Sequence, residues 1–359
     1  MNFAKLMRFY SKKRILITGH NGFKGSWLSL LLKELSADVM GFSMNPPSKP
    51  CLYEALKLKS EVPGIRGDIT KYKEIEKAIR DYDPEIIIHL AARPILLNSY
   101  EAPLETYQTN TIGTLNLLQA AYKVGSPKAI LNVTTDKVYE NTGKRKAYTE
   151  EDKLGGHDPY SSSKACSELV TQSYRESFFS EIGVGVATAR AGNVIGGGDW
   201  GEKRLVPDLI TSFVAKRKLV IRHPEAVRPW QYVLDVLSGY LMLTESVYLE
   251  PSYYSGAYNF SNRYPKTVIE LVRAFIQAWG SGSVEVRHST KHEDQFLALD
   301  SSKAMKKLGW KPATTFNEMA SLTTEWYKRY YSNKEIIEYS KKIVEDYAER
   351  QKVIKRLTQ

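Results

Sequence analysis

Two pairs of side chains in this chain have the types and spacing that proton transfer requires. Asp136 and Lys137 place a carboxyl group and an amine side by side, just after the apolar run 129–133. Tyr160 and Lys164 lie four residues apart, so on a helix they would share one face. A lysine beside a phenol stabilises the phenolate and lowers the phenol pKa from about 10. We therefore expect one acid–base pair and one phenol that can accept a proton.

The apolar run before the acid–base pair is short and continuous, which is typical of a buried parallel strand. The pair would then lie at a strand's carboxyl end, where open α/β sheets bind ligands. The alternative is a surface turn with a solvated ion pair. The Tyr-x-x-x-Lys spacing also begins at Tyr53 and Tyr330, so the spacing alone carries little information. Only Tyr160 follows the strand that bears the acid–base pair, and this order favours chemistry there.

A glycine-rich turn precedes both pairs. It follows the apolar run 14–18 and leads into residues 24–35, whose apolar positions predict a helix. Strand, glycine turn and helix form the context of a dinucleotide fingerprint, in which the backbone and the helix N-terminus approach a pyrophosphate. The spacing here is Gly-x-x-Gly-x-x-Gly rather than Gly-x-Gly-x-x-Gly. We expect an NAD site that includes Gly19, Asn21, Gly22, Phe23, Lys24 and Gly25.

Further cofactor contacts are expected where the later strands end. No acid ends the strand 38–42, so Ser43 or Asn45 is expected to hold the ribose, and this position does not decide between NAD and NADP. Asp68 could bond the adenine or cap the next helix, and both interpretations stay open. The remaining expected contacts are Ile69, Leu90, Ala91, Ala92, Asn110, Tyr160 and Lys164.

Strands and helices alternate through the first half of the chain, which predicts an α/β fold with a doubly wound parallel Rossmann sheet. We predict that residues 1–190 form the NAD-binding domain and that 229–260 return to it. Residues 191–228 and 261–330 are predicted to form a smaller C-terminal α/β substrate domain. Residues 331–359 are predicted to form a helical tail.

The composition excludes several classes of protein. The 359 residues are 42% hydrophobic and 25% charged, as expected of a globular protein. No apolar run approaches about 18 residues and the basic start lacks a signal-peptide core, so we expect no membrane contact. Cys51 and Cys166 are far apart and no Cys–His cluster exists, so we expect no metal site and a cytoplasmic location. The net charge of +11 lacks a nucleic-acid motif, so a solvated basic tail is favoured over a nucleic-acid partner.

Several segments together resemble the extended short-chain dehydrogenase/reductase family, specifically the CDP-D-glucose 4,6-dehydratases. These segments are TGHNGFKGSW, HLAA, TTDKVYEN, DPYSSSK, RAGNVIGGGDW and RPW. The similarity runs from about Lys13 to about Trp326. The Asp-Lys pair is its most specific element, because related dTDP-sugar dehydratases carry Asp-Glu there and epimerases of this scaffold lack such a pair.

The resemblance implies an NAD-dependent, redox-neutral dehydration of a nucleoside-diphosphate hexose, with CDP-D-glucose favoured and CDP-4-keto-6-deoxy-D-glucose as the product. Tyr160 would take the proton of the 4-hydroxyl as hydride leaves C4, and Thr135 would bond the 4-oxygen. Lys137 would then remove the C5 proton while Asp136 protonates the departing 6-hydroxyl, and the hydride returns to C6. A homodimer through the helices around Tyr160 and a role in deoxysugars for lipopolysaccharide O-antigen are also implied.

By the same resemblance, a group of polar residues should bind the substrate. Asn193 and Arg228 are expected at its diphosphate, with Arg204 as a third contact, because guanidinium forks bond two oxygens at once. A helix cap or a surface charge is the alternative for each. Trp200 is expected either near the base or sugar or in core packing, and His292 near the nucleotide.

The sequence departs from the family pattern at three positions. Family members carry Gln, Arg and Cys where Arg93, Leu97 and Val138 stand. Arg93 is expected to lie close to the sugar. Two other functions stay open: a nucleotide-sugar epimerase, which would have no use for Lys137, and a non-catalytic dinucleotide-sensing or nucleic-acid-binding protein, which would not need Tyr160.

Overall fold

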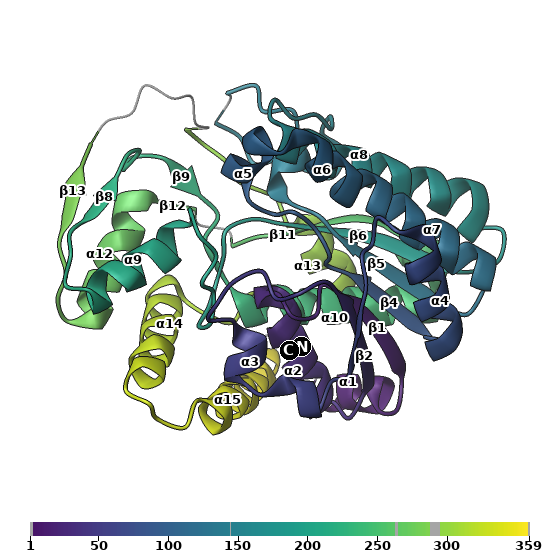
Figure 1. Cartoon of the computed structure of the whole chain (residues 1–359), viewed down its shortest axis with the longest axis horizontal. Coiled ribbons are helices and arrows are strands. Elements are labelled where there is room, and N and C mark those ends of the chain that lie inside the picture. Colours follow the sequence, from purple (N-terminus) through teal and green to yellow (C-terminus); the bar gives the residue numbers. More distant parts are fainter. Residues whose placement is uncertain (1–2, 144, 263–264, 288–294, 358–359) are drawn as a thin grey trace.

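A parallel sheet of seven strands forms the centre of the molecule (Figure 1). The computed structural model describes residues 3–143, 145–262, 265–287 and 295–357. The strand order is β11-β6-β5-β4-β1-β2-β3, and every neighbouring pair is parallel. The strands are β1 (Arg14–Thr18), β2 (Asp38–Ser43), β3 (Gly64–Arg66), β4 (Ile86–His89), β5 (Ala129–Val133), β6 (Gly185–Ala191) and β11 (Gly256–Phe260). The predicted α/β Rossmann class is confirmed.

Helices cover both faces of this sheet, because successive strand residues point to opposite sides. On β1, Ile15 and Ile17 join one apolar cluster and Leu16 joins the other. The first face is covered by α1 (Phe3–Tyr10), α2 (Phe23–Glu34) and α10 (Val233–Leu249), and the second by α4 (Tyr72–Tyr82), α7 (Gly113–Val124) and α8 (Pro159–Tyr174) (Figure 1). The order in which strands are added to the sheet reverses at β1, because β2 and β3 lie on one side of it and β4, β5 and β6 on the other. Ligands of doubly wound sheets bind at such a reversal point.

The start of α8 is fixed by local signals in the sequence. The Asp158 side chain accepts a hydrogen bond from the Ser161 amide at 2.9 Å, and Pro159 occupies the first helical position. Both features favour a helix start at this residue. Tyr160 therefore lies in the first turn of α8, at the carboxyl edge of the sheet.

The helical segment between β4 and β5 that begins at Pro103 is divided in three. The helix α6 (Pro103–Tyr107) passes into a π-helical turn, η2 (Gln108–Ile112), and then into α7. A Cβ on Gly113 would lie 2.7 Å from Ile69 Cγ2, so the glycine lets Ile69 pack against the helix. π-Helical turns often occur at functional sites, and this one carries the buried Asn110.

A smaller lobe follows β6 (Figure 1). Its short strands are β8 (Leu219–Ile221), paired with β13 (Val284–Val286), and β9 (Val227–Arg228), paired with β12 (Lys266–Thr267). The helices α9 (Leu205–Val214) and α12 (Val268–Trp279) lie beside them. The strands β7 (Val194–Ile195) and β10 (Gln231–Tyr232) pair with each other where the chain leaves and re-enters the larger unit.

After β10 the chain returns to the central sheet. The helix α10 packs on its first face and β11 pairs with β6. Three more helices complete the chain: α13 (Ser302–Leu308), α14 (Phe316–Tyr331) and α15 (Ile336–Leu357). Three short helices lie in connections: α3 (Leu52–Ala55), α5 (Leu96–Glu101) and α11 (Pro251–Tyr254). In the described part of the chain, no helix has the length and apolar character that crossing a bilayer requires.

Candidate active site

The predicted acid–base pair lies in a tight, buried turn after β5. Thr135 begins a short 3-10 helix, η3 (Asp136–Val138), where its Oγ1 donates to Asp136 Oδ1 at 2.9 Å and accepts from the Lys137 amide at 3.3 Å. Asp136 is 3% exposed. Burial raises the pKa of its carboxyl group, although the nearby Lys137 charge and the Thr135 hydroxyl partly oppose this. This carboxyl group therefore holds a proton more readily than an ordinary aspartic acid.

One oxygen of the Asp136 carboxyl group is available for chemistry. Oδ2 is buried and has no hydrogen-bond partner among the described residues. A Cβ built on Gly192 would lie 1.7 Å from this oxygen, so the chain after β6 lies directly against the carboxyl group. A side chain at position 192 would displace the acid. Sequence reasoning missed this role of Gly192, because the contact joins segments that are far apart in the chain.

The second predicted pair lies beside the first. Lys164 is buried and donates from Nζ to the Val133 carbonyl oxygen at 2.9 Å. Burial lowers the pKa of Lys164 to about 8, although the charge of Glu168 opposes the shift. The Lys164 side chain thus connects α8 to the last residue of β5.

The expected lowering of the Tyr160 pKa by Lys164 is wrong for this structure. Burial raises the pKa of the Tyr160 phenol to about 12, and the lowering influences that follow are a hydrogen bond with Thr135 and the charge of Arg204. The negative charge of Asp136 raises it further. Burial has the largest effect on the Tyr160 pKa because a buried phenolate loses its hydration. The Thr135 bond also brings Tyr160 next to the acid–base turn.

Lys24 connects the glycine turn to this centre. It lies in the first turn of α2, with its Nζ 5.8 Å from the centroid of the Tyr240 ring. Burial lowers the pKa of Lys24 to about 7, with further lowering by the charges of Lys164 and Arg204 and an opposing effect of Asp136. Three cations and one carboxyl group therefore share this part of the sheet edge.

The glycine turn can hold a diphosphate. A Cβ on Gly19 would meet the Ala91 amide nitrogen at 2.8 Å, and a Cβ on Gly25 would lie 2.2 Å from the Gly19 carbonyl oxygen. A Cβ on Gly22 would meet only the Gly19 oxygen, at 3.4 Å, so the space over Gly22 is open. Gly22 also begins α2 without a capping side chain, which leaves the first amides of the helix to an anion. The turn therefore fits the pyrophosphate of a dinucleotide.

The side chains in and beside the glycine turn contact other parts of the protein. Asn21 Nδ2 donates to the Met44 carbonyl oxygen at 2.8 Å, which joins the turn to the end of β2. Phe23 is partly buried against the main apolar cluster. The expected ribose residue Ser43 is bonded through its hydroxyl to His20 Nδ1 at 3.1 Å. Ser43 therefore already has one partner within the protein.

A hollow lies beyond the carboxyl ends of β2 and β3. Asp68 lines it, and Asp68 Oδ1 also accepts from the Thr70 amide at 2.9 Å. The helix α4 begins after Lys71 without a capping side chain, so Asp68 does not have the helix-capping role that was the alternative. Arg66 also lines the hollow, and sequence reasoning missed it. The residues around the hollow are Met44, Asn45, Arg66, Gly67, Asp68 and Glu74. An adenosine could be bound here by polar groups from two strand ends.

The end of β4 is held close to β1 and η2. The amides of Leu90 and Ala91 both donate to Thr18 Oγ1 at 3.2 Å, and Ala92 follows them partly buried. Asn110 Oδ1 accepts from the Arg93 amide at 2.8 Å. Asn110 therefore orders the loop after β4. The Arg93 side chain is exposed.

Of the residues expected to bind the substrate diphosphate, the structure brings Arg228 close to the Asp136 carboxyl group. Arg228 is buried, and its positive charge lowers the pKa of Asp136. Arg204 Nη1 bonds both oxygens of Asp199, at 2.9 and 3.2 Å. Asn193 is exposed and follows Gly192 with a left-handed φ of 47°.

Trp200 lies in an aromatic cluster, which supports the core-packing alternative. Its ring centroid is 4.8 Å from that of Tyr330, 5.6 Å from that of Trp326 and 5.8 Å from that of Tyr327. A contact of Trp200 with a base or sugar stays a prediction. His292 lies outside the described residues. Across the part of the chain that is described, no group of three or more His, Cys, Asp or Glu side chains is arranged to hold a metal ion.

Comparisons with known proteins agree with this geometry. The sequence model of the family described as "GDP-mannose 4,6 dehydratase" matches residues 16–323. A CDP-glucose 4,6-dehydratase from Salmonella typhimurium is 41% identical over 348 residues, which cover 94% of this chain and 97% of the relative.

Solved structures show the same fold. A dTDP-glucose 4,6-dehydratase from Bacillus anthracis, in complex with NAD, aligns with a TM-score of 0.74 and 26% identity over 88% of this chain and 97% of its own. A UDP-glucose 4-epimerase from Thermotoga maritima, with UDP-glucose, aligns with a TM-score of 0.78 and 24% identity over 89% of this chain and 99% of its own. Both dehydratases and epimerases therefore share this architecture.

Proposed function

Because the chain belongs to the GDP-mannose 4,6-dehydratase family, we propose that it is an NAD-dependent lyase that converts CDP-D-glucose to CDP-4-keto-6-deoxy-D-glucose. The observation that carries this proposal is the buried Asp136 carboxyl group, with one unbonded oxygen, in a turn that also holds Lys137. An elimination needs both an acid and a base at one carbon–carbon bond. The 41% identity with a CDP-glucose 4,6-dehydratase favours CDP-glucose over other nucleotide sugars.

The first half of the reaction is assigned to Tyr160. Its phenol takes the proton of the sugar 4-hydroxyl while Thr135 bonds the 4-oxygen. Bound NAD would supply the hydride acceptor, the later hydride donor and a positive charge. The positive charge of bound NAD would oppose the effect of burial, which raises the pKa of Tyr160 to about 12.

The second half is assigned to the acid–base pair. The ketone formed at C4 acidifies the C5 proton, which Lys137 removes. As the double bond forms between C5 and C6, the C6–O bond breaks and Asp136 gives its proton to the departing hydroxyl, so water leaves. Burial raises the pKa of Asp136, and this keeps the required proton on the carboxyl group. Lys137 returns a proton to C5 as hydride is delivered to C6.

The binding residues follow from the same geometry. The amides of the glycine turn and the charge of Lys24 would hold the NAD pyrophosphate, and the hollow beyond β2 and β3 would take its adenosine. Arg228, Arg204 and Asn193 would bind the diphosphate of the substrate. Arg93 would contact the sugar.

The enzyme is proposed to work as a homodimer in the cytoplasm. Large apolar side chains are exposed on neighbouring helices near Tyr160: Tyr100 on α5 is 61% exposed, Leu104 on α6 is 66% exposed and Leu169 on α8 is 54% exposed. A second copy that packs these helices against its own would bury them. Both cysteines are free, which fits a reducing compartment. Sedimentation of the protein and of a Leu169→Glu variant tests the dimer, which the charged variant should dissociate.

The test of the activity is incubation with CDP-D-glucose and NAD, followed by mass spectrometry of the nucleotide sugar. We expect a product that is lighter by one water. Tyr160→Phe should lower kcat by about 10³-fold, because general acid–base groups contribute 10²–10⁴-fold. Tyr72→Phe, on the far helix α4, should leave kcat unchanged.

The same measurement separates the alternatives. An epimerase would return a sugar of unchanged mass, and the shared fold with UDP-glucose 4-epimerases makes this the alternative to exclude. A product of unchanged mass, or no turnover of any nucleotide sugar in a panel, would contradict the proposal.

A further inference from the structure

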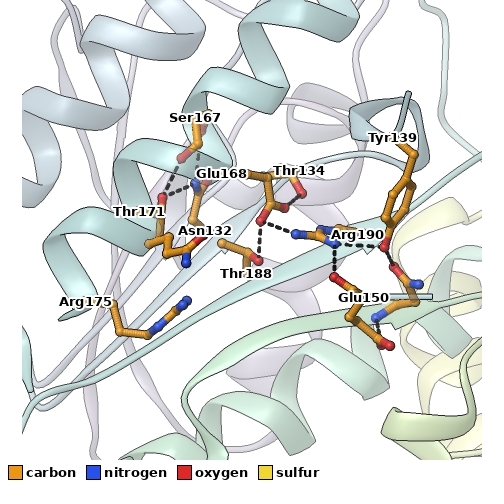
Figure 2. A network of polar contacts seen from close by, with 12 residues as sticks. Asn132, Thr134, Tyr139, Glu150, Ser167, Glu168, Thr171, Arg175, Thr188 and Arg190 are labelled. Carbon is orange, nitrogen blue, oxygen red and sulfur yellow. Dashed lines mark hydrogen bonds and ion pairs between the residues drawn. The ribbon is translucent and has the colours of Figure 1, made fainter. Parts of the chain in front are cut away.

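A buried carboxylate lies one helical turn beyond Lys164 on α8. Glu168 is 3% exposed and accepts hydrogen bonds from three side chains (Figure 2). Thr134 Oγ1 donates to Oε1, and Thr188 Oγ1 donates to Oε2 at 2.7 Å. Arg190 Nη2 completes the set with an ion pair at 2.9 Å. Burial alone would raise the pKa of Glu168, but Arg190 and the hydroxyl donors hold it below its usual value, so the carboxylate is charged.

The partner cation extends the network in the opposite direction. Arg190 lies on β6 and is 4% exposed. Its Nη1 donates to Tyr139 Oη at 2.8 Å and to the Glu150 carbonyl oxygen at 3.3 Å. Tyr139 Oη in turn donates to Asn259 Oδ1 on β11 at 2.7 Å. Figure 2 shows Arg190 between the Glu168 carboxylate and the Tyr139 ring.

These contacts hold the two ends of the acid–base turn. Thr134 immediately precedes the segment 135–138 and Tyr139 immediately follows it. Glu168 binds the first of these flanking residues and Arg190 binds the second. Because the two charged groups are also paired with each other, one ion pair fixes both ends of the turn relative to α8 and β6.

A stabilising role alone does not account for this arrangement. Buried ion pairs lose hydration, and apolar residues of similar size are often as stable. A charged pair does supply directed bonds, which apolar packing cannot supply. The net charge of the pair is zero, although the Glu168 carboxylate still raises the pKa of Lys164 against the effect of burial.

We infer that Glu168 and Arg190 are positioning residues that set the distance of Asp136 and Lys137 from the helix that carries Tyr160 and Lys164. The inference rests on the proposed function for its kinetic consequences. Its structural part, the order of the turn, stands independently. A catalytic group displaced by about 1 Å can cost 10²-fold in rate. The elimination half of the reaction should suffer more than the oxidation half, because both elimination residues lie on the turn, whereas the turn contributes only Thr135 to the oxidation.

Two variants weaken the contacts that hold the turn, the first more strongly than the second. Glu168→Gln keeps the size of the side chain and removes its charge, and should lower kcat by about 10²-fold with KM within about threefold. Thr134→Val removes one hydroxyl bond at the first end of the turn, and should lower kcat by about tenfold. In both variants reduced nicotinamide should accumulate during turnover, measured by its absorbance, because oxidation continues while elimination slows.

Thr188→Val is the matched control. It removes a hydrogen bond to the same carboxylate, at an equally buried position, but on β6 and outside the turn. The melting temperatures of Thr134→Val and Thr188→Val should fall by similar amounts. The kcat of Thr188→Val should stay within about threefold of the parent, since the turn keeps its anchor.

Amide hydrogen exchange of the protein without substrate gives a readout that does not depend on activity. Exchange in residues 134–139 should accelerate in Glu168→Gln and Thr134→Val, but not in Thr188→Val. Equal kcat losses in the two threonine variants, or unchanged exchange of the turn in Glu168→Gln, would overturn the inference. If the parent protein fails to dehydrate CDP-glucose, the proposed function falls, while the exchange result still decides whether this ion pair orders the turn.

Discussion

Two turns at the carboxyl edge of one sheet have opposite construction. The glycine turn after β1 depends on side chains that are missing: Gly19 and Gly25 allow backbone segments to approach, and Gly22 leaves open space above the start of α2. The turn after β5 depends on side chains that are present and buried, chiefly Thr135 and Asp136. The glycine turn can bind a ligand through its backbone, whereas the turn after β5 can transfer a proton to or from a ligand. A shared position in the fold therefore does not determine chemical role.

The largest expected effect comes from removing the base of the second turn. Lys137→Met should lower the rate of dehydration by about 10²–10⁴-fold, the usual contribution of a general base. Hydride transfer from the sugar should persist, because Tyr160 and Lys164 are intact. Reduced nicotinamide should therefore accumulate, which absorbance measures directly. Lys153→Met, which alters an exposed lysine paired with Glu140, should behave like the parent, and a fully active Lys137→Met would break the comparison.

The glycine turn offers a smaller and sharper test. Gly22→Ala places a Cβ where only the Gly19 oxygen lies within 4 Å, so the free protein should keep its melting temperature. Its dissociation constant for NAD should rise by about tenfold or more, because the methyl group enters the space of the pyrophosphate. Titration calorimetry with NAD measures this.

Gly25→Ala is the contrasting variant at the same turn. Its Cβ would lie 2.2 Å from the Gly19 oxygen, so the protein itself should lose about 1–3 kcal/mol of stability through overpacking. Denaturation in urea without NAD measures the loss. If Gly22→Ala binds NAD as tightly as the parent, the turn does not hold the pyrophosphate.

The smallest expected effect concerns stability and pH. Burial raises the pKa of the Asp136 carboxyl group, so the folded protein holds this proton more tightly than the unfolded chain does. The contribution of Asp136 is therefore most favourable below its unfolded pKa of about 3.9 and is lost as pH rises through the folded pKa. Asp136→Asn should stabilise the protein at neutral pH by about 1 kcal/mol while removing activity. The gain should shrink toward pH 4.

Asp152 provides a control of the opposite sign. A hydrogen bond from Lys146 lowers the pKa of Asp152, so its contribution is present above the unfolded pKa and lost as pH falls through the folded one. Asp152→Asn should therefore destabilise the protein at neutral pH. Urea denaturation at several pH values measures both variants. Destabilisation by Asp136→Asn at neutral pH would show that its carboxylate is better solvated than the structure indicates.

Much of the fold was predictable from local pattern. The strands at 14–18 and 129–133 begin and end where the apolar runs do, because parallel strands buried on both faces need continuous apolar residues. The positions of Asp136 and Tyr160 followed from their order after such strands. The predicted direction of the Tyr160 pKa shift was wrong. This pKa depends on burial by distant segments, which spacing along one helix does not reveal.

Other parts of the site depend on contacts between distant segments. The role of Gly192 requires the carboxyl group of Asp136 to lie against it, and the ion pair of Glu168 requires Arg190 on a different strand. Trp200 packs on α14, more than a hundred residues away in the chain. None of these pairings has a fixed sequence spacing. Of these residues, only Glu168 could have been recognised from the sequence. It lies four residues after Lys164, on the same face of the helix, and a charged residue on a buried helix face needs a polar or charged partner.

The last strand of the sheet has a consequence for how the chain becomes folded. β11 begins at Gly256, yet it pairs with β6, which ends at Ala191, so α9, β8 and β9 of the smaller lobe are synthesised between two hydrogen-bonded neighbours. Until β11 arrives, β6 is an open edge that can pair with another chain and aggregate. A fragment that stops at residue 190 would keep that edge permanently, and would also lack α10 from one face. The half of the sheet that precedes residue 190 is thus not a separable module, because its completion waits for β11, which follows part of the smaller lobe.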